Sequence, residues 1–169
     1  MNIYSITHKA NQLQDLLALT ESRRDEWNTS TKSLIKDTLD FVKSQTKLNW
    51  FVQNAPTIKN LENVNIQFHS KPSGIVSRDL LGERIIHYTK EGGKLYFAQS
   101  ANGEIFTAIS YPYIAHEDDY LIERKIFNVI AKLEPHSVSK EFIVSQVENY
   151  LDEMIEWEAN INNYQKIGF

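Results

Sequence analysis

The residue types that bind metals occur in this sequence without the spacing that metal sites need. There are five histidines, and no two of them stand four positions apart or form an H-x-E pattern. One segment, His116 to Asp119, places an imidazole beside three carboxylates, but it lacks the alternating ligands and the turn glycine of a calcium loop. The sequence therefore predicts a solvated loop at this segment, and neither a metal nor any other cofactor.

Nucleophilic chemistry would require a serine that is held beside a base and an oxyanion donor. The segment "KPSGIVSRD" offers Ser73 and Arg78 around Gly74, yet it contains neither a nucleophile elbow nor an S-x-x-K pattern. We interpret it as a turn. The alternative hypothesis is a small hydrolase or transferase whose pocket lies between the N-terminal helix and the sheet and is lined by His87, Ser73 and Arg78.

Other reaction classes lack their sequence signals as well. No G-x-x-x-x-G-K or G-x-G-x-x-G segment is present for nucleotide binding. The absence of cysteine removes thiolate nucleophiles, disulfides and cysteine-ligated metals. The carboxylate pairs Glu83 with Glu104 and Glu117 with Asp118 lie in no setting that predicts a raised pKa. An enzyme is therefore unsupported, and a non-catalytic protein is the leading hypothesis.

Charge and hydropathy limit the classes of binding partner and the cellular compartment that we expect for this protein. The net charge is −4, with 18 basic and 22 acidic residues, and no basic run exceeds Arg23-Arg24, so nucleic acid is not an expected partner. Binding of a single-stranded nucleic acid by stacking of its bases on tyrosines also needs nearby cations, and only Lys90 and Lys94 are available. Neither a signal peptide at the start nor an apolar run of about 18 residues is present. We expect a cytoplasmic protein that is not inserted in a membrane.

Residues 1–55 are expected to form a helical arm. Leucines recur with helical spacing, and glycine and proline are absent from residues 5–55. One continuous helix fits a coiled-coil-like ladder with alternating steps of four and three through Leu13, Leu17, Trp27 and Leu34. A helical hairpin with its second cap at Thr29 or Ser30 fits as well, and both alternatives stay open here. A projecting helix would leave its apolar stripe unburied, which predicts a homo-oligomer.

Residues 56–169 are expected to form an antiparallel sheet of about five strands and a C-terminal helix, in one domain with the arm. Strands are predicted at 61–70, 83–90, 94–101 and 104–111, with a break at residues 71–74. Residues 120–134 fit a helix or a strand, and their β-branched residues favour the strand. Ser137 or Ser139 caps the last helix, whose stripe includes Phe142, Val147 and Leu151.

Turn chemistry predicts how the central strands pair. Gly92-Gly93 and Asn102-Gly103 suit two-residue hairpin loops, which place Glu91 opposite Lys94 and Ala101 opposite Glu104. One face of the predicted meander then carries Ile86, Tyr88, Leu95, Phe97, Phe106 and Ala108. The opposite face carries Ile85, His87, Thr89, Tyr96, Ala98, Ile105, Thr107, Ile109 and Tyr111.

These patterns predict an α+β fold and a non-catalytic protein-interaction or adaptor protein. The mixed face of tyrosine, isoleucine and histidine needs a cover, which is either the chain's own N-terminal helix or a protein interface. If it is an interface, the predicted binding residues are His87, Tyr96, Ile109, Tyr111 and Tyr113. The acidic side of the C-terminal helix, with Glu148, Asp152, Glu153, Glu156 and Glu158, is typical of a solvated face, and the alternative hypothesis is a docking surface for a basic partner. We expect a homodimer and a protein partner whose identity the sequence leaves open.

Overall fold

The computed structural model describes residues 3–58, 61–78, 82, 84–116 and 127–159. The helical elements are α1 (Ile3–Glu26), the π-helical turn η1 (Trp27–Thr31), α2 (Lys32–Ser44), the 3-10 turn η2 (Pro135–Ser137) and α3 (Lys140–Ala159). The strands are β1 (Trp50–Ile58), β2 (Leu61–Phe68), β3 (Lys71–Arg78), β4 (Ile85–Glu91), β5 (Lys94–Gln99), β6 (Ile105–Ser110), β7 (Tyr113–His116) and β8 (Phe127–Leu133).

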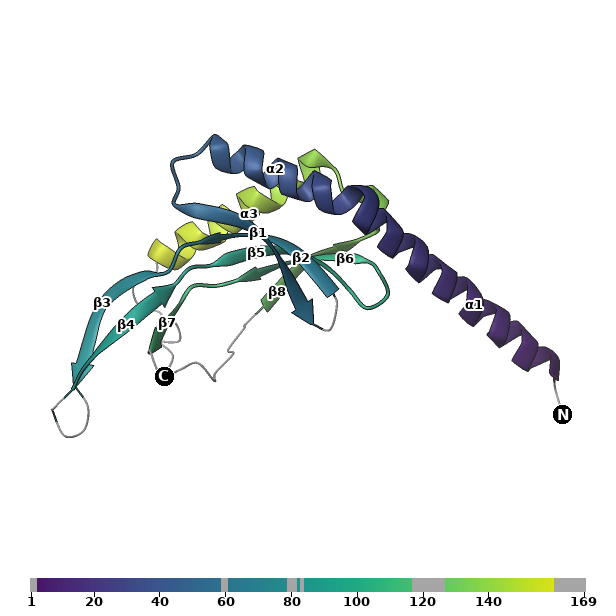
Figure 1. Ribbon diagram of the computed structural model, residues 1–169, viewed down its shortest axis with the longest axis horizontal. Helices are drawn as coiled ribbons and strands as arrows, with labels where there is room; N and C mark the ends of the chain where they lie inside the picture. The colour runs from purple at the N-terminus through teal and green to yellow at the C-terminus, as the bar shows by residue number, and fades with distance from the viewer. Residues whose placement is uncertain (1–2, 59–60, 79–81, 83, 117–126, 160–169) are drawn as a thin grey trace.

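The fold is α+β, as predicted. A five-stranded antiparallel sheet has the order β1-β2-β5-β6-β8, and a separate three-stranded sheet has the order β3-β4-β7. Helices α2 and α3 lie over one face of the larger sheet, and the smaller sheet extends from the body on the side away from α1 (Figure 1). No helix in the described ranges is long and apolar enough to cross a membrane.

The N-terminal region forms one continuous helix rather than a hairpin. Glu26, Thr31 and Lys32, at the borders of η1, all keep right-handed helical dihedral angles, so the chain does not turn there. The amide of Lys32 donates to the carbonyl of Trp27, which is the five-residue step of a π turn. The helix ends at Ser44, and Trp50 already begins β1.

The hairpin between β5 and β6 corrects the predicted pairing by one residue. Tyr96 stands opposite Ala108, and Gln99 stands opposite Ile105. The loop holds three residues, with Gly103 in the left-handed region at φ 82°, and the amide of Ser100 donates to the carbonyl of Glu104 over 2.8 Å. Three-residue hairpin loops use such a glycine. The shift moves the side chains of β6 to the opposite face.

The segment Gly92-Gly93 is not a hairpin turn, which is a second correction. It carries the chain from β4 in one sheet to β5 in the other, and neither glycine is among those with positive φ. A Cβ atom on Gly92 would collide with the carbonyl of Phe68, and one on Gly93 with the sulfur of Met154. These glycines therefore serve close packing, and the meander that was predicted to include β4 does not form.

Strands β1 and β3 were not predicted, because residues typical of turns occur within them. Both contain a proline, and both lie at the edge of their sheet, where a missing amide donor costs no hydrogen bond. The expected break at residues 71–74 is thus the start of β3. Strand β8 confirms the strand interpretation over Phe127–Leu133, and the rest of 120–134 before it lies outside the described residues.

The core lies between the helices and the larger sheet. Phe97 contacts Phe142 edge to face at 6.5 Å between ring centroids, and the hydroxyl of Tyr150 donates to the carbonyl of Gly93 over 2.7 Å. Ser139 caps α3 by accepting from the amide of Phe142 over 3.1 Å, which confirms one of the two predicted caps. The fully buried apolar side chains include Trp27, Ile35, Leu39, Trp50, Val64, Ile66, Leu95, Phe97, Ile105, Ile109, Ile143 and Tyr150.

The substitution Gly103→Ala tests how closely the helix sits on this hairpin. Gly74 and Gly103 share a positive φ, but a Cβ atom on Gly103 would approach the Cβ of Arg23 to 2.7 Å, whereas one on Gly74 meets nothing within 4 Å. We expect Gly74→Ala to lower the free energy of unfolding by about 1–2 kcal/mol from backbone strain alone. Gly103→Ala should cost clearly more in urea denaturation, and equal costs would contradict the close contact.

Candidate protein-interaction surface

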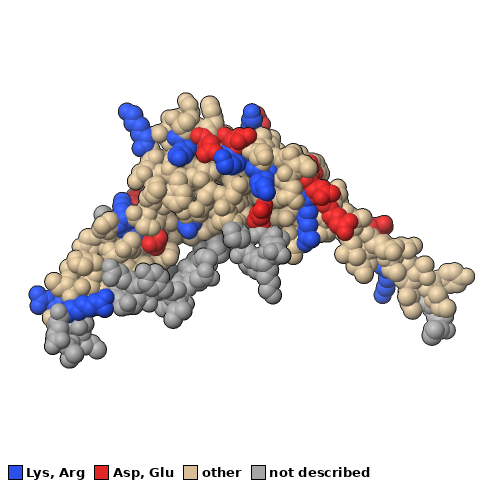
Figure 2. Space-filling view, viewed as in Figure 1, with Lys and Arg blue, Asp and Glu red and all other residues tan. Residues whose placement is uncertain are grey.

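Helix α1 projects from the body as an arm along which no residue is buried (Figure 1). Its far end is mostly uncharged, whereas acidic and basic side chains gather where it joins the body (Figure 2). We define the arm stripe as Ile3, Ile6, Ala10, Leu13 and Leu17, which follow one another at steps of three and four. The four large members are 57–63% exposed. This is a continuous apolar face that the described chain does not cover.

The arm stripe faces the same side as the sheet. At the base of the arm, Thr20 and Arg23 lie against Gly103 of the β5–β6 loop. Leu17 and Leu13 precede Thr20 by three and seven positions and therefore share its face of the helix. The helical face that packs on the sheet through Trp27, beyond Thr20, thus continues along the arm after the sheet has ended.

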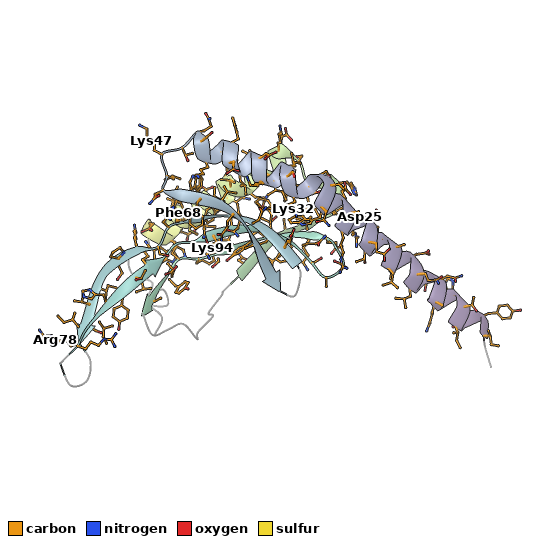
Figure 3. The ribbon with its side chains drawn as sticks, in the orientation of Figure 1. Asp25, Lys32, Lys47, Phe68, Arg78 and Lys94 are labelled. Carbon is orange, nitrogen blue, oxygen red and sulfur yellow. The ribbon has the colours of Figure 1, made fainter. Side chains whose placement is uncertain are left out.

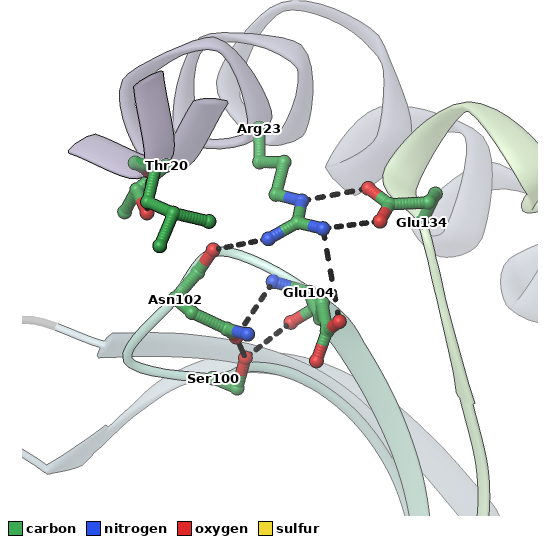
Figure 4. A network of polar contacts seen from close by, with 7 residues as sticks. Thr20, Arg23, Ser100, Asn102, Glu104 and Glu134 are labelled. Atoms are coloured by element: carbon green, nitrogen blue, oxygen red, sulfur yellow. Dashed lines mark hydrogen bonds and ion pairs between the residues drawn. The ribbon is translucent and has the colours of Figure 1, made fainter. Parts of the chain in front are cut away.

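A network around Arg23 holds the base of the arm (Figure 4). The Nε atom donates to Oε2 of Glu134 over 2.7 Å, and Nη2 donates to Oε1 of the same carboxylate. Nη1 donates to the carbonyl of Asn102 over 3.1 Å, and Glu104 lies 3.7 Å from Nη2. The hydrogen bond from Arg23 lowers the pKa of Glu134. A planar guanidinium with two bonds to one carboxylate fixes direction as well as distance.

A second anchor lies one turn further along the helix, in the π turn. Trp27 is buried, and its Nε1 atom donates to Oε2 of Glu62 on β2 over 3.3 Å. Lys32 donates to the same oxygen over 2.6 Å and points from the helix toward the sheet (Figure 3). Its hydrogen bond, aided by that of Trp27, lowers the pKa of Glu62. Two adjacent contacts therefore set the angle at which the arm leaves the body.

The five predicted binding residues do not lie together. Ile109 is completely buried beneath the helices, while Tyr96 is half-buried on the other face of the larger sheet. His87 and Tyr113 are exposed on the smaller sheet. Tyr111 is half-buried, and its hydroxyl donates to Glu153 over 2.8 Å; burial and this bond raise its pKa. Their grouping followed from the incorrect register, and their role in binding stays a prediction.

The hydrolase hypothesis gains no support from its three residues. The hydroxyl of Ser73 donates to the carbonyl of Tyr88 over 2.7 Å and accepts from the amide of Ile75, so backbone groups hold it instead of an imidazole. His87 is exposed on β4, and Arg78 lies at the end of β3 far from the N-terminal helix (Figure 3). No group of metal-ligating side chains occurs among the described residues, and of the segment 116–119 only His116 is described.

Sequence reasoning missed the polar row on the second face of β2. Asn63, Asn65 and Gln67 alternate with the core residues of this strand, a pattern typical of a solvent-facing side, but all three are buried. Asn63 donates to the carbonyl of Ala55 over 2.8 Å and accepts from Asn65 over 2.7 Å. The side-chain oxygens of Asn65 and Gln67 have no hydrogen-bond partner among the described residues. Strand β2 lies between β1 and β5, and the alternation of polar and apolar residues alone does not reveal whether its second face is covered.

The acidic side of α3 is exposed as expected. Glu148, Asp152 and Glu156 follow one another at steps of four and lie on the outer side of the helix. Like charges at this spacing destabilise a helix by about 0.2–0.5 kcal/mol per pair. In the described ranges no hydrogen bond or ion pair neutralises these three carboxylates. We call this set the acidic row.

Comparisons with known proteins assign no family, since no family model, no curated protein and no solved structure matches this chain. The geometry above is therefore the basis for any functional proposal.

The Arg23 network predicts a measurable acid sensitivity. A carboxylate whose pKa is lowered in the folded protein from the ordinary 4.5 stabilises the fold above that value and loses this effect as the pH falls through the lowered pKa. We expect Glu134→Gln to reduce the difference in the free energy of unfolding between pH 7 and pH 3.5. Urea denaturation at both pH values measures it. Glu148→Gln serves as the control, and an equal change in both variants would contradict a role for the Arg23 pair.

Proposed function

We propose that this chain is a non-catalytic interaction protein that acts as a homodimer, joined through the arm stripe. The observation that carries the proposal is a helix of 24 residues without a buried residue that nonetheless continues the apolar face of a buried helix. Most helical stability in proteins comes from packing of such a face and not from intrinsic propensity. A helix in this position gains that stability from a second molecule.

The free energy available from the arm stripe suits a reversible dimer. Full burial of a leucine or isoleucine side chain is worth about 1.5–3 kcal/mol, so the exposed part of each large stripe residue is worth roughly 1–2 kcal/mol. Four such residues from each of two arms supply about 8–16 kcal/mol in this approximation. Association costs about 4–15 kcal/mol in lost freedom. The surplus of a few kcal/mol supports association without requiring a permanent complex.

The acidic row supports the second part of the proposal, a basic protein partner. The row lies on α3 while the arm stripe lies on α1, so a dimer joined at the arms presents two copies of the row. Repeated weak sites within one assembly bind more tightly than either site alone when the partner can reach both. We infer that the dimer serves to display this acidic surface twice.

Substitutions on opposite sides of the arm test the dimer. We expect Leu13→Glu or Leu17→Glu to convert the protein to a species of one chain mass, 19.6 kDa, because a buried unpaired carboxylate is strongly unfavourable. Leu19→Glu is the matched control, since Leu19 is exposed on the same helix but outside the arm stripe. Light scattering measures the mass of each variant. A monomeric wild type, or dissociation by Leu19→Glu alone, would overturn the proposal.

Neutralising the acidic row tests the partner surface. The triple substitution Glu148→Gln, Asp152→Asn, Glu156→Gln should abolish capture of basic proteins that the wild-type chain retains from the native host at low salt. The matched control Asp25→Asn, Glu26→Gln, Asp37→Asn removes the same charge from the N-terminal helix outside the arm stripe. Mass spectrometry of the retained proteins gives the comparison, and equal loss with both triple variants would argue against a specific role for α3.

A further inference from the structure

We propose that the two arms pair antiparallel, with Ile6 of one copy packed against Leu17 of the second copy and Ala10 against Leu13. This inference rests on the proposed homodimer and specifies its geometry. In this register the two-fold axis crosses the arms between Asn11 and Gln12. Each arm then ends beside the base of the other, and the two sheet-bearing bodies lie at opposite ends of the paired helices.

The position of the body excludes the parallel arrangement. The arm stripe faces the same side as the sheet, and at the arm's base this side is occupied by the β5–β6 loop, with Gly103 in contact with Thr20 and Arg23. Packed helices lie about 8–10 Å apart. A parallel partner seated on the stripe would continue past Thr20 directly into this loop and the neighbouring η2. In the antiparallel register Ile3 of the second copy lies level with Thr20, so the described part of the partner helix does not extend past Thr20 into this loop.

Side-chain sizes along the stripe complement one another in the antiparallel register. Small Ala10 meets large Leu13 on both sides of the axis, so that these two central layers combine unequal volumes and fill the space between the helices. In a parallel pair Ala10 would face Ala10 and leave a gap in the middle of the interface. Such gaps forfeit packing contacts in proportion to their volume.

The distribution of charge along α1 also favours antiparallel pairing of the two arms. The first half of α1 carries His8 and Lys9 and has no acidic residue in its first turn, so the positive end of the helix dipole has no carboxylate of its own. The second half carries Asp15 and Glu21, while its two arginines are engaged by the body, Arg23 by Glu134 and Arg24 by the carbonyl of Ala101. In the antiparallel register Glu21 of the second copy lies level with the start of the helix at Ile3. The partner therefore supplies the negative charge that this terminus lacks.

Cysteine pairing distinguishes the two directions because the chain contains no cysteine of its own. In the antiparallel pair the two copies of residue 6 are eleven positions apart along the axis, about 16 Å, which no disulfide can span. We expect an oxidised mixture of Ile6→Cys and Leu17→Cys chains, one of them tagged, to form the covalent heterodimer. Neither variant should form a covalent dimer alone, and a mixture of Ile6→Cys with Leu19→Cys is the matched control.

The possible outcomes test the antiparallel geometry of the arms and the existence of the homodimer separately. Covalent dimers of Ile6→Cys alone would show parallel arms and overturn the inference while the homodimer stands. A wild type that is dimeric by light scattering but whose 6 and 17 variants never cross-link would show that the arms do not pair. A monomeric wild type would overturn both. Light scattering of each variant under reducing conditions establishes that the cysteines have not altered the assembly.

Discussion

The guanidinium of Arg23 joins three distant parts of the chain at the point where the long helix leaves the sheet. It bonds to Glu134, which follows β8, and to Asn102 in the β5–β6 loop, while the Cβ and Cδ atoms of the same side chain lie against Gly103. Trp27 adds a buried contact one turn later. The helix is thus held firmly at its base and extends freely beyond it. The exposed stripe, and with it the proposed dimer, follows from this arrangement.

The features that local periodicity determines could be predicted from the sequence. The helical region lacks glycine and proline, and its apolar positions recur at steps of three and four, so the continuous helix was one of two expected forms. The helix α3 and its Ser139 cap follow from the same kind of signal. The arm stripe was foreseeable because helical faces are set within the segment itself. Whether that face meets the sheet or solvent depends on where the sheet ends, which no local pattern contains.

The features that depend on strand register could not be predicted in the same way. Asn102-Gly103 is compatible with loops of two or three residues, and the difference of one residue exchanged the two faces of β6. Ile109 moved into the core as a result, away from His87 and Tyr96. Proline in β1 and β3 resembled a chain break because edge position is a property of the whole sheet. The buried row on β2 was missed because a local alternation of polar and apolar residues is typical of a strand with one solvent-facing side.

The π turn at Trp27–Thr31 affects the rotation of α1 relative to α2 about the helix axis. A π turn holds one residue more than regular helix, and each residue advances an α-helix by about 100°. The buried residues of α2 lie after this turn, and the arm stripe lies before it. Loss of a single residue here would leave both ends helical yet swing the leucines out of line with the sheet. The rotation of the arm stripe relative to the buried face of α2 therefore depends on one additional residue, while Arg23 and Trp27 hold the base of the arm.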